Sequence, residues 1–152
     1  SYEEALKRYE LAFATAMAIT AKTSEKAYLC LSMSWLVRGQ RKLLDVNAPD
    51  YSEKYKEYME AEKELQEKAL EGFSYAIQTE NYPMCGNMDQ HTVDYITAAL
   101  YYKTGNYDAS LKLLSGIIVS NSASKRIKDN ARDLKDRIAA AKKNPDQIVP
   151  VD

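Results

Sequence analysis

The sequence predicts an all-α protein of about six helices that pair into antiparallel hairpins. Five glycines and four prolines among 152 residues are too few for the many tight turns of an all-β chain. The prolines fall between segments of helical periodicity, as expected of a residue that helix interiors exclude. Similar spacings of aromatic and small residues recur in separate segments, which favours hairpins that stack as repeats.

The first predicted helix, over residues 2–19, carries apolar side chains at three- and four-residue steps, including Leu6 and Tyr9. The second, over residues 24–38, is apolar almost all round, as expected of a helix that lies between two others. Gly39 is expected to end it.

A connection that contains Pro49 leads to the third and longest predicted helix, over residues 51–80. Thirty helical residues span about 45 Å, so its charged first half is expected to project past the other helices or to bend. Its glutamates alternate with lysines and are interpreted as a solvated face, not as a catalytic pair of carboxylates. They are Glu57, Glu60, Glu62, Glu64, Glu67 and Glu71.

Three further helices are predicted over residues 88–104, 107–119 and 124–143. Gly105 is expected to end the first of them, and a proline near residue 145 follows the last. We therefore expect a single helical domain over residues 1–143 and a disordered tail over residues 144–152.

Two of these segments resemble the first helix of a tetratricopeptide repeat, with a small residue, an aromatic and a glycine at the expected steps. The residues are Tyr28, Leu31, Ser32, Trp35 and Gly39 in one segment, and Ala98, Tyr101 and Gly105 in the other. Ser110 stands where the second helix of such a repeat usually has alanine.

The resemblance implies a short right-handed superhelix. In it, Ser32 and Ala98 let paired helices approach, while Trp35, Tyr101, Tyr9 and Phe73 fill the space between pairs. The alternative is a plain helical bundle whose aromatic residues match by chance.

Longer stretches are similar to the C-terminal helical part of an uncharacterised bacterial family, domain of unknown function 2225. The similarity covers residues 2–142 and is carried by residues 29–38, 102–107 and 128–133 together with the spacing of Ala5, Tyr9 and Ala12. Proteins of that family resemble a zinc ribbon followed by tetratricopeptide-like helices. No paired CxxC motif occurs in this sequence, so the chain is expected to be a fragment of a longer bacterial protein.

Charge and composition exclude several classes of function. A net charge of −1 gives no general attraction to nucleic acid or to an anionic membrane. No apolar run approaches the ~20 residues that span a bilayer. Two cysteines and one histidine are too few for a closed zinc site. We therefore expect a cytoplasmic protein without a metal, a cofactor or a membrane partner.

Three side chains are weighed as reactive groups. His91 is a candidate proton carrier or ligand, although a histidine in the first turn of a helix is usually just solvated. Cys30 is interpreted as a small buried hydrophobe. Cys85 precedes a helix and is a candidate reactive thiol, but an ordinary loop cysteine is the simpler interpretation. With no catalytic residue designated, the protein is predicted not to be an enzyme.

The predicted function is the binding of a protein or peptide segment in a concave groove. In a tetratricopeptide array the first helix of each pair lines that groove, where methionine adapts its shape, tyrosine offers contact area and lysine attracts an acidic group. The expected groove residues are Lys26, Leu29, Cys30, Met33 and Leu36, with Thr92, Tyr95, Ala99, Tyr102 and Lys103. The alternative is a groove that the chain fills by itself.

Two other functions remain open. Tyr51, Tyr55 and Tyr58 share one helix face and are candidates for a homodimer contact. The last helix has a surplus of basic residues that suits phosphates, which makes a nucleic-acid contact the weaker alternative. Intrahelical pairs from Asp129 to Arg132 and from Asp133 to Arg137 are expected to neutralise part of that surplus.

Overall fold

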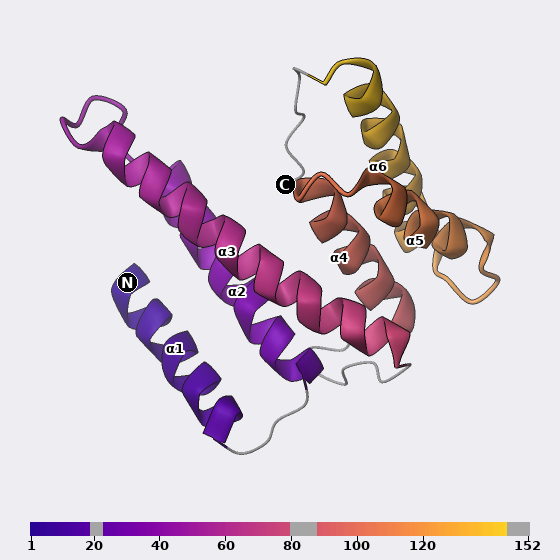
Figure 1. Cartoon of the computed structure of the whole chain (residues 1–152), viewed down its shortest axis with the longest axis horizontal. Coiled ribbons are helices and arrows are strands. Elements are labelled where there is room, and N and C mark those ends of the chain that lie inside the picture. The colour runs from indigo at the N-terminus through magenta and orange to yellow at the C-terminus, as the bar shows by residue number, and fades with distance from the viewer. Residues whose placement is uncertain (19–22, 80–87, 146–152) are drawn as a thin grey trace. The chain divides into compact units, whose positions relative to one another are not determined.

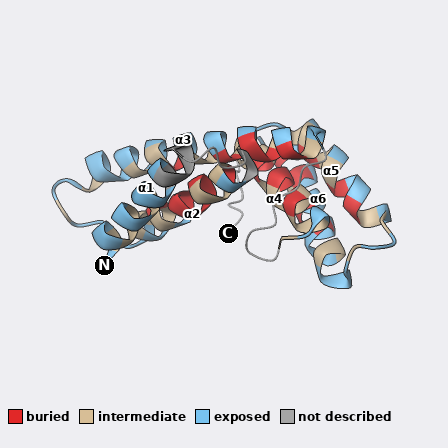
Figure 2. Cartoon of the chain, turned by 90° about the horizontal axis from the view of Figure 1, so that it is seen from below, coloured by how far each residue is buried: buried red, intermediate tan, exposed pale blue. Residues whose placement is uncertain are grey.

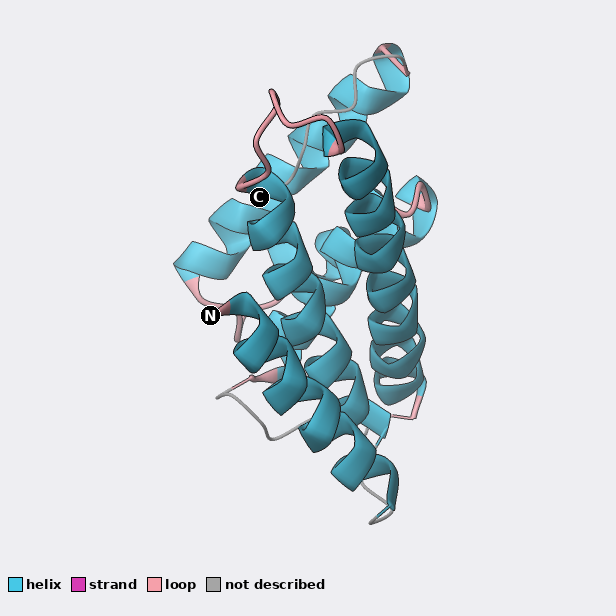
Figure 3. Cartoon of the chain, turned by 90° about the vertical axis from the view of Figure 1, so that its left-hand side faces the viewer, coloured by secondary structure: helices cyan, strands magenta, loops and turns pink. Residues whose placement is uncertain are grey.

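A computed structural model describes residues 1–18, 23–79 and 88–145 of the chain. Within these ranges the regular structure is helical throughout and includes no strand (Figure 3). The helices are α1 (Tyr2–Ala18), α2 (Thr23–Lys42), α3 (Tyr51–Gln78), α4 (Gln90–Lys103), α5 (Tyr107–Val119) and α6 (Lys125–Lys143). The prediction of an all-α protein with six helices is confirmed. The predicted disordered tail lies, from residue 146 onward, outside the described residues.

The chain divides into two compact units, Ser1–Asn81 and Tyr82–Asp152. The first unit holds α1, α2 and α3, and the second holds α4, α5 and α6. A single domain over residues 1–143 stays a prediction, because two units of three helices are compatible with one repeat array.

In the first unit α2 is the middle helix. It runs antiparallel to α3 along most of its length, and α1 packs against it (Figure 1). Its buried side chains occur on nearly every turn, which explains the apolar character that the sequence shows all round this helix. They are Ala27, Cys30, Leu31, Ser32, Met33, Ser34 and Val37.

The α2 helix does not end at Gly39 but continues to Lys42. Gly39 therefore has an ordinary helical conformation, and the prediction that it forms the turn of a repeat is wrong. A glycine inside a helix costs only about 1 kcal/mol, and the three residues that follow it are good helix formers. The added turn also brings Arg41 to an ion pair with Glu62 of α3.

The α3 helix is about 42 Å long and differs between its two halves. Its buried residues are Glu62, Ala69, Gly72, Phe73 and Ala76, so that most of the first half is exposed (Figure 2). The first half is nevertheless not free of its neighbours: Arg41 of α2 lies over the Tyr55 ring, and Tyr58 contacts Tyr2 of α1. The expectation that this half projects past the other helices is therefore wrong for these residues.

The second unit begins with a well-capped helix. The Asp89 side chain accepts a hydrogen bond from the backbone N–H of Thr92 at 2.8 Å and caps α4. At its other end the N–H of Asn106 bonds to Tyr101 O at 2.8 Å, and Gly105 has a φ of 83°. This is a Schellman motif, which needs a left-handed residue and therefore favours glycine. The prediction that Gly105 ends this helix is confirmed.

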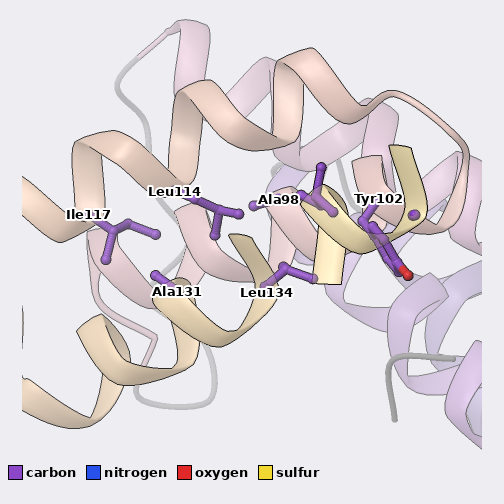
Figure 4. Close-up of a cluster of buried hydrophobic side chains, with 8 residues drawn as sticks. Ala98, Tyr102, Leu114, Ile117, Ala131 and Leu134 are labelled. Atoms are coloured by element: carbon purple, nitrogen blue, oxygen red, sulfur yellow. The ribbon is translucent and has the colours of Figure 1, made fainter. Parts of the chain in front are cut away.

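The core of the second unit joins all three of its helices (Figure 4). Ala98 of α4 lies against α5, and the Ser110 hydroxyl donates a buried hydrogen bond to the backbone oxygen of Ala98 at 2.7 Å. Serine replaces the usual alanine here without cost, because its hydroxyl has an acceptor. The buried members of the core are Ala98, Tyr102, Leu114, Ile117, Ala131, Leu134, Ile138 and Ala141.

The small residues of the repeat pattern are buried as predicted, whereas the aromatics differ. Ser32 and Ala98 are both buried, and Phe73 is fully buried. Tyr9 and Tyr101 are half-buried, and Trp35 remains 44% exposed. The role predicted for these rings, between successive pairs of helices, stays a prediction.

Candidate functional site

The five α2 residues predicted to line a groove differ in their exposure. Met33 is only 6% exposed and belongs to the core of the first unit, as does Cys30. Lys26, Leu29 and Leu36 are half-buried. Because α2 has α1 packed against it as well as α3, the methionine serves the core and is not an open contact residue.

In the second unit the predicted groove side of α4 meets its own neighbours. Tyr102 is 5% exposed and is a member of the core, and Tyr95 and Ala99 pack against that core. Burial raises the pKa of the Tyr95 hydroxyl, and the nearby Asp133 of α6 raises it further. The chain thus covers this side of α4 itself, with Tyr107 of α5 against Tyr102 and Asp133 of α6 near Tyr95. Thr92 and Lys103, which are half-buried, stay predicted contact residues in this unit.

Large apolar side chains are instead exposed at the end of the α2–α3 hairpin. Leu43 and Val46 of the connecting loop are 77% and 68% exposed. Tyr55 and Met59 follow in the first turns of α3 and are also exposed. We call these four residues the hairpin end. The repeat pattern did not indicate them, because they belong to the long insertion between its two helices.

An ion pair fixes the hairpin end on its scaffold. The Arg41 Nε donates to Glu62 Oε2 at 3.1 Å, and the Glu62 carboxylate also accepts from Gln66 Nε2 at 3.3 Å. The Arg41 guanidinium lies over the ring of Tyr55, with 5.7 Å between its Cζ and the ring centroid. One cation therefore connects the last turn of α2 to two successive regions of α3.

The loop of the hairpin is itself held by local hydrogen bonds. The Asp45 carboxylate accepts from the N–H of Asn47 at 2.9 Å, and the Asp45 backbone oxygen accepts from Ala48 N at 3.1 Å. An aspartate that bonds the backbone two residues ahead is typical of a tight turn. The exposed side chain of Val46 therefore projects from an ordered turn.

The three tyrosines predicted to form a dimer contact do not act as one surface. Tyr51 and Tyr55 lie together, with 5.6 Å between their ring centroids. Tyr58 instead makes an edge contact with Tyr2 of α1 at 6.3 Å, and burial raises the pKa of the Tyr2 hydroxyl. Of the three, Tyr58 therefore helps to attach α1, and Tyr55 belongs to the hairpin end.

His91 has partners that its sequence context did not indicate. Its Nε2 lies 2.8 Å from Ser122 Oγ and 3.3 Å from Ser120 Oγ, both in the α5–α6 connection. Its Nδ1 is buried without a hydrogen-bond partner. A bare acceptor nitrogen is cheaper to bury than an unpaired N–H, which places the ring proton on Nε2. The expected solvated histidine is thus a half-buried link between α4 and a loop about thirty residues later.

The cysteines offer no reactive centre among the described residues. Cys30 is buried, as predicted, and burial raises the pKa of its thiol. A raised pKa disfavours the nucleophilic thiolate. Cys85 lies outside the described residues. Within the part of the chain that the structure describes, no three His, Cys, Asp or Glu side chains gather as ligands for a metal ion.

Comparison with known proteins shows where the chain belongs. Residues 1–138 match the family described as uncharacterized protein conserved in bacteria (DUF2225). The chain belongs to this family. No curated protein matches it, and no solved structure matches it. The family resemblance that the sequence suggested is thus confirmed over most of the chain.

Two further features of this DUF2225 chain bear on its surface. In α6 the predicted intrahelical pairs are present, with Arg132 bonded to Asp129 at 3.3 Å and Arg137 to Asp133 at 3.2 Å. None of the helices in the described ranges is long and apolar enough to cross a bilayer.

Proposed function

We propose that this chain is a protein-binding module without catalytic activity, and that the hairpin end is its main contact surface. The single observation that carries the proposal is the exposure of Leu43, Val46, Tyr55 and Met59 at one end of one hairpin. Large apolar side chains exposed singly are common on protein surfaces, but four of them within seventeen residues favour a contact site.

The hairpin end supports binding because it is ordered before a partner arrives. Each side chain or loop that must be immobilised on binding costs free energy. The turn at Asp45 and the Arg41–Glu62 ion pair already hold the backbone and the Tyr55 ring. A partner therefore gains the apolar contact at a lower entropic cost.

The partner we propose is a protein segment with its own exposed apolar side chains. Methionine adapts to differently shaped neighbours, and an aromatic ring supplies rigid contact area. Charged side chains of both signs surround the hairpin end, including the Asp50–Lys54 ion pair at 3.3 Å. This mixed border suits a protein surface with a polar rim better than it suits a phosphate backbone.

Site-specific photo-crosslinking tests the proposal. A photoreactive phenylalanine analogue is placed at Val46 in the full-length protein in its host cell, and a matched one at Lys112, which is exposed on α5. We expect one discrete crosslinked protein from position 46 and none from position 112.

The crosslinked protein is then purified and titrated against the chain. We expect saturable binding that Leu43→Ser with Met59→Ser weakens at least about tenfold, because apolar contact area is lost. The matched control is Leu11→Ser, which removes an apolar side chain that is exposed on α1. Equal binding by the wild type and the double variant would exclude the hairpin end as the contact surface.

A further inference from the structure

One side of α6 carries a row of lysines at heptad spacing. Lys128, Lys135 and Lys142 follow each other at seven-residue steps. Such positions lie about 10 Å apart along the helix axis and drift by only about 20° per step. Within the described residues no ion pair engages Lys128 or Lys135, and Lys142 is bonded to Asp108 of α5 at 3.0 Å. We call this row the lysine row.

Other charges of α6 leave the lysine row basic. Arg132 and the two lysines at the helix ends, Lys125 and Lys143, border it and are exposed. Of the three aspartates, Asp129 is paired with Arg132 and Asp133 with Arg137, so these two carboxylates partly neutralise two of the arginines. Over its nineteen residues the helix has eight basic and three acidic side chains. The helix is therefore basic as a whole, with Lys135 exposed, Lys128 half-buried and Lys142 bonded to Asp108 of α5.

The first unit carries an acidic counterpart with the same period. Two interleaved heptad series of glutamates run along α3, and both lie opposite the face that buries Ala69, Phe73 and Ala76. All six are exposed, and among the described residues only Glu64 is in an ion pair, with Lys68 at 3.4 Å. They are Glu53, Glu57, Glu60, Glu64, Glu67 and Glu71, and we call them the glutamate stripe.

The two surfaces are opposite in charge and share a period. The glutamate stripe covers nineteen residues of α3, and the lysine row covers fifteen residues of α6. Each lysine of the row can therefore meet a carboxylate at every heptad when the two helices lie side by side. Regular opposite charges on neighbouring helices set partner choice and register, as the flanking positions of coiled coils do.

We propose that the lysine row of one copy of this chain binds the glutamate stripe of a second copy. This self-recognition goes beyond the proposed function, because it uses neither the hairpin end nor its partner. The contact joins two different surfaces, so it links copies head to tail and forms a closed pair, a ring or a chain of copies. Its affinity is electrostatic and therefore depends on salt.

Charge reversal with mixing tests the proposal on the full 152-residue chain. One variant is Lys128→Glu with Lys135→Glu, and the other is Glu60→Lys with Glu67→Lys. Each has two surfaces of the same sign and is expected to stay monomeric in sedimentation velocity. Mixed together, each variant offers the surface that the other needs, so we expect association to return.

The wild type is expected to self-associate in about 0.01 M salt, where the Debye length is about 30 Å, and to be monomeric in about 1 M salt. A matched control, Lys7→Glu with Arg126→Glu, makes the same change in net charge away from both surfaces. It should associate like the wild type, whereas Lys128→Glu with Lys135→Glu should weaken association more than about tenfold.

Three results would overturn the proposal. The wild type stays monomeric at low salt, the two reversed variants fail to associate when mixed although both keep their helical circular dichroism, or the control loses association as much as the reversed variants do. A monomeric wild type that binds a DNA duplex through Lys128 and Lys135 would assign the lysine row to nucleic acid. None of these results depends on the hairpin end, which Leu43→Ser with Met59→Ser tests separately.

Discussion

The two units of this chain solve the packing of three helices in different ways. The second unit buries apolar side chains from all three of its helices in one cluster. The first unit buries few side chains in the first half of α3, where a partly buried ion pair holds α2 to α3. Near that end of the hairpin large apolar side chains remain exposed. A region with a small core thus has apolar surface available for contact.

Truncation of one leucine in each unit should give the largest difference in the free energy of unfolding. Leu114→Ala removes a fully buried side chain and should lower the free energy of unfolding by about 2–5 kcal/mol. Leu43→Ala removes the same atoms from a side chain that is 77% exposed and should change it by less than about 0.5 kcal/mol. Urea denaturation measures both values. Equal losses would show that the hairpin end is covered in the folded protein.

Removal of the Arg41 side chain is expected to have the next largest effect on the free energy of unfolding. Arg41→Ala leaves the Glu62 carboxylate, whose side chain is only 9% exposed, without its cation. Because Gln66 still donates to this carboxylate, we expect a loss of about 2 kcal/mol, below the range for a fully buried pair. The control is the same substitution in a Glu62→Gln background, where the loss should be smaller. Additive losses would show that the pair is not coupled.

Removal of the α4 cap tests the second unit at its edge. Asp89→Ala should cost about 1 kcal/mol, because the N–H of Thr92 loses its acceptor. Hydrogen bonds from the Thr92 backbone and hydroxyl hold the pKa of Asp89 below its ordinary value of 3.8. The carboxylate therefore stabilises the fold fully above pH 3.8. This stabilisation is lost as the pH falls through the lower pKa of the folded state.

Denaturation at several pH values measures this effect. The wild type should lose stability on acidification below pH 3.8 more steeply than Asp89→Asn, whose amide oxygen keeps a cap but does not titrate. Parallel curves for the two proteins would contradict the role that we assign to the carboxylate.

The smallest effect is expected from the exposed ion pair of the second unit. Lys142→Ala breaks the bond to Asp108, a carboxylate that is 96% exposed. Exposed pairs contribute less than about 1 kcal/mol and weaken with salt. We expect a loss of about 0.3 kcal/mol at low salt and none in about 1 M salt. A loss similar to that of Arg41→Ala would remove the contrast between the two ion pairs.

Local rules predicted most of the helices correctly. Proline positions, apolar periodicity and caps placed all six helices within a few residues, and Gly105 ends α4 as its Schellman geometry requires. The same rule was wrong at Gly39, because a glycine ends a helix only where the chain needs a left-handed residue. Tertiary contact by Arg41 favours a further helical turn there.

The candidate surface was harder to predict than the fold. A repeat pattern gives the register of a helix but not which neighbour covers each side, so Tyr95 and Tyr102 were expected on an open groove and are packed in the second unit. The hairpin end lies in an insertion for which the pattern has no rule. The link between His91 and Ser122 was equally hidden, since it joins residues 31 positions apart.

That link between His91 and the α5–α6 connection has a consequence for how the second unit opens. A hydrogen bond that closes a loop of about thirty residues limits independent fraying of the first turn of α4. Amide protons of that turn should therefore exchange with solvent at rates close to those at the start of α6, as expected of one cooperative folding unit. In His91→Ala, the amide protons of the first turn of α4 should exchange faster than those at the start of α6.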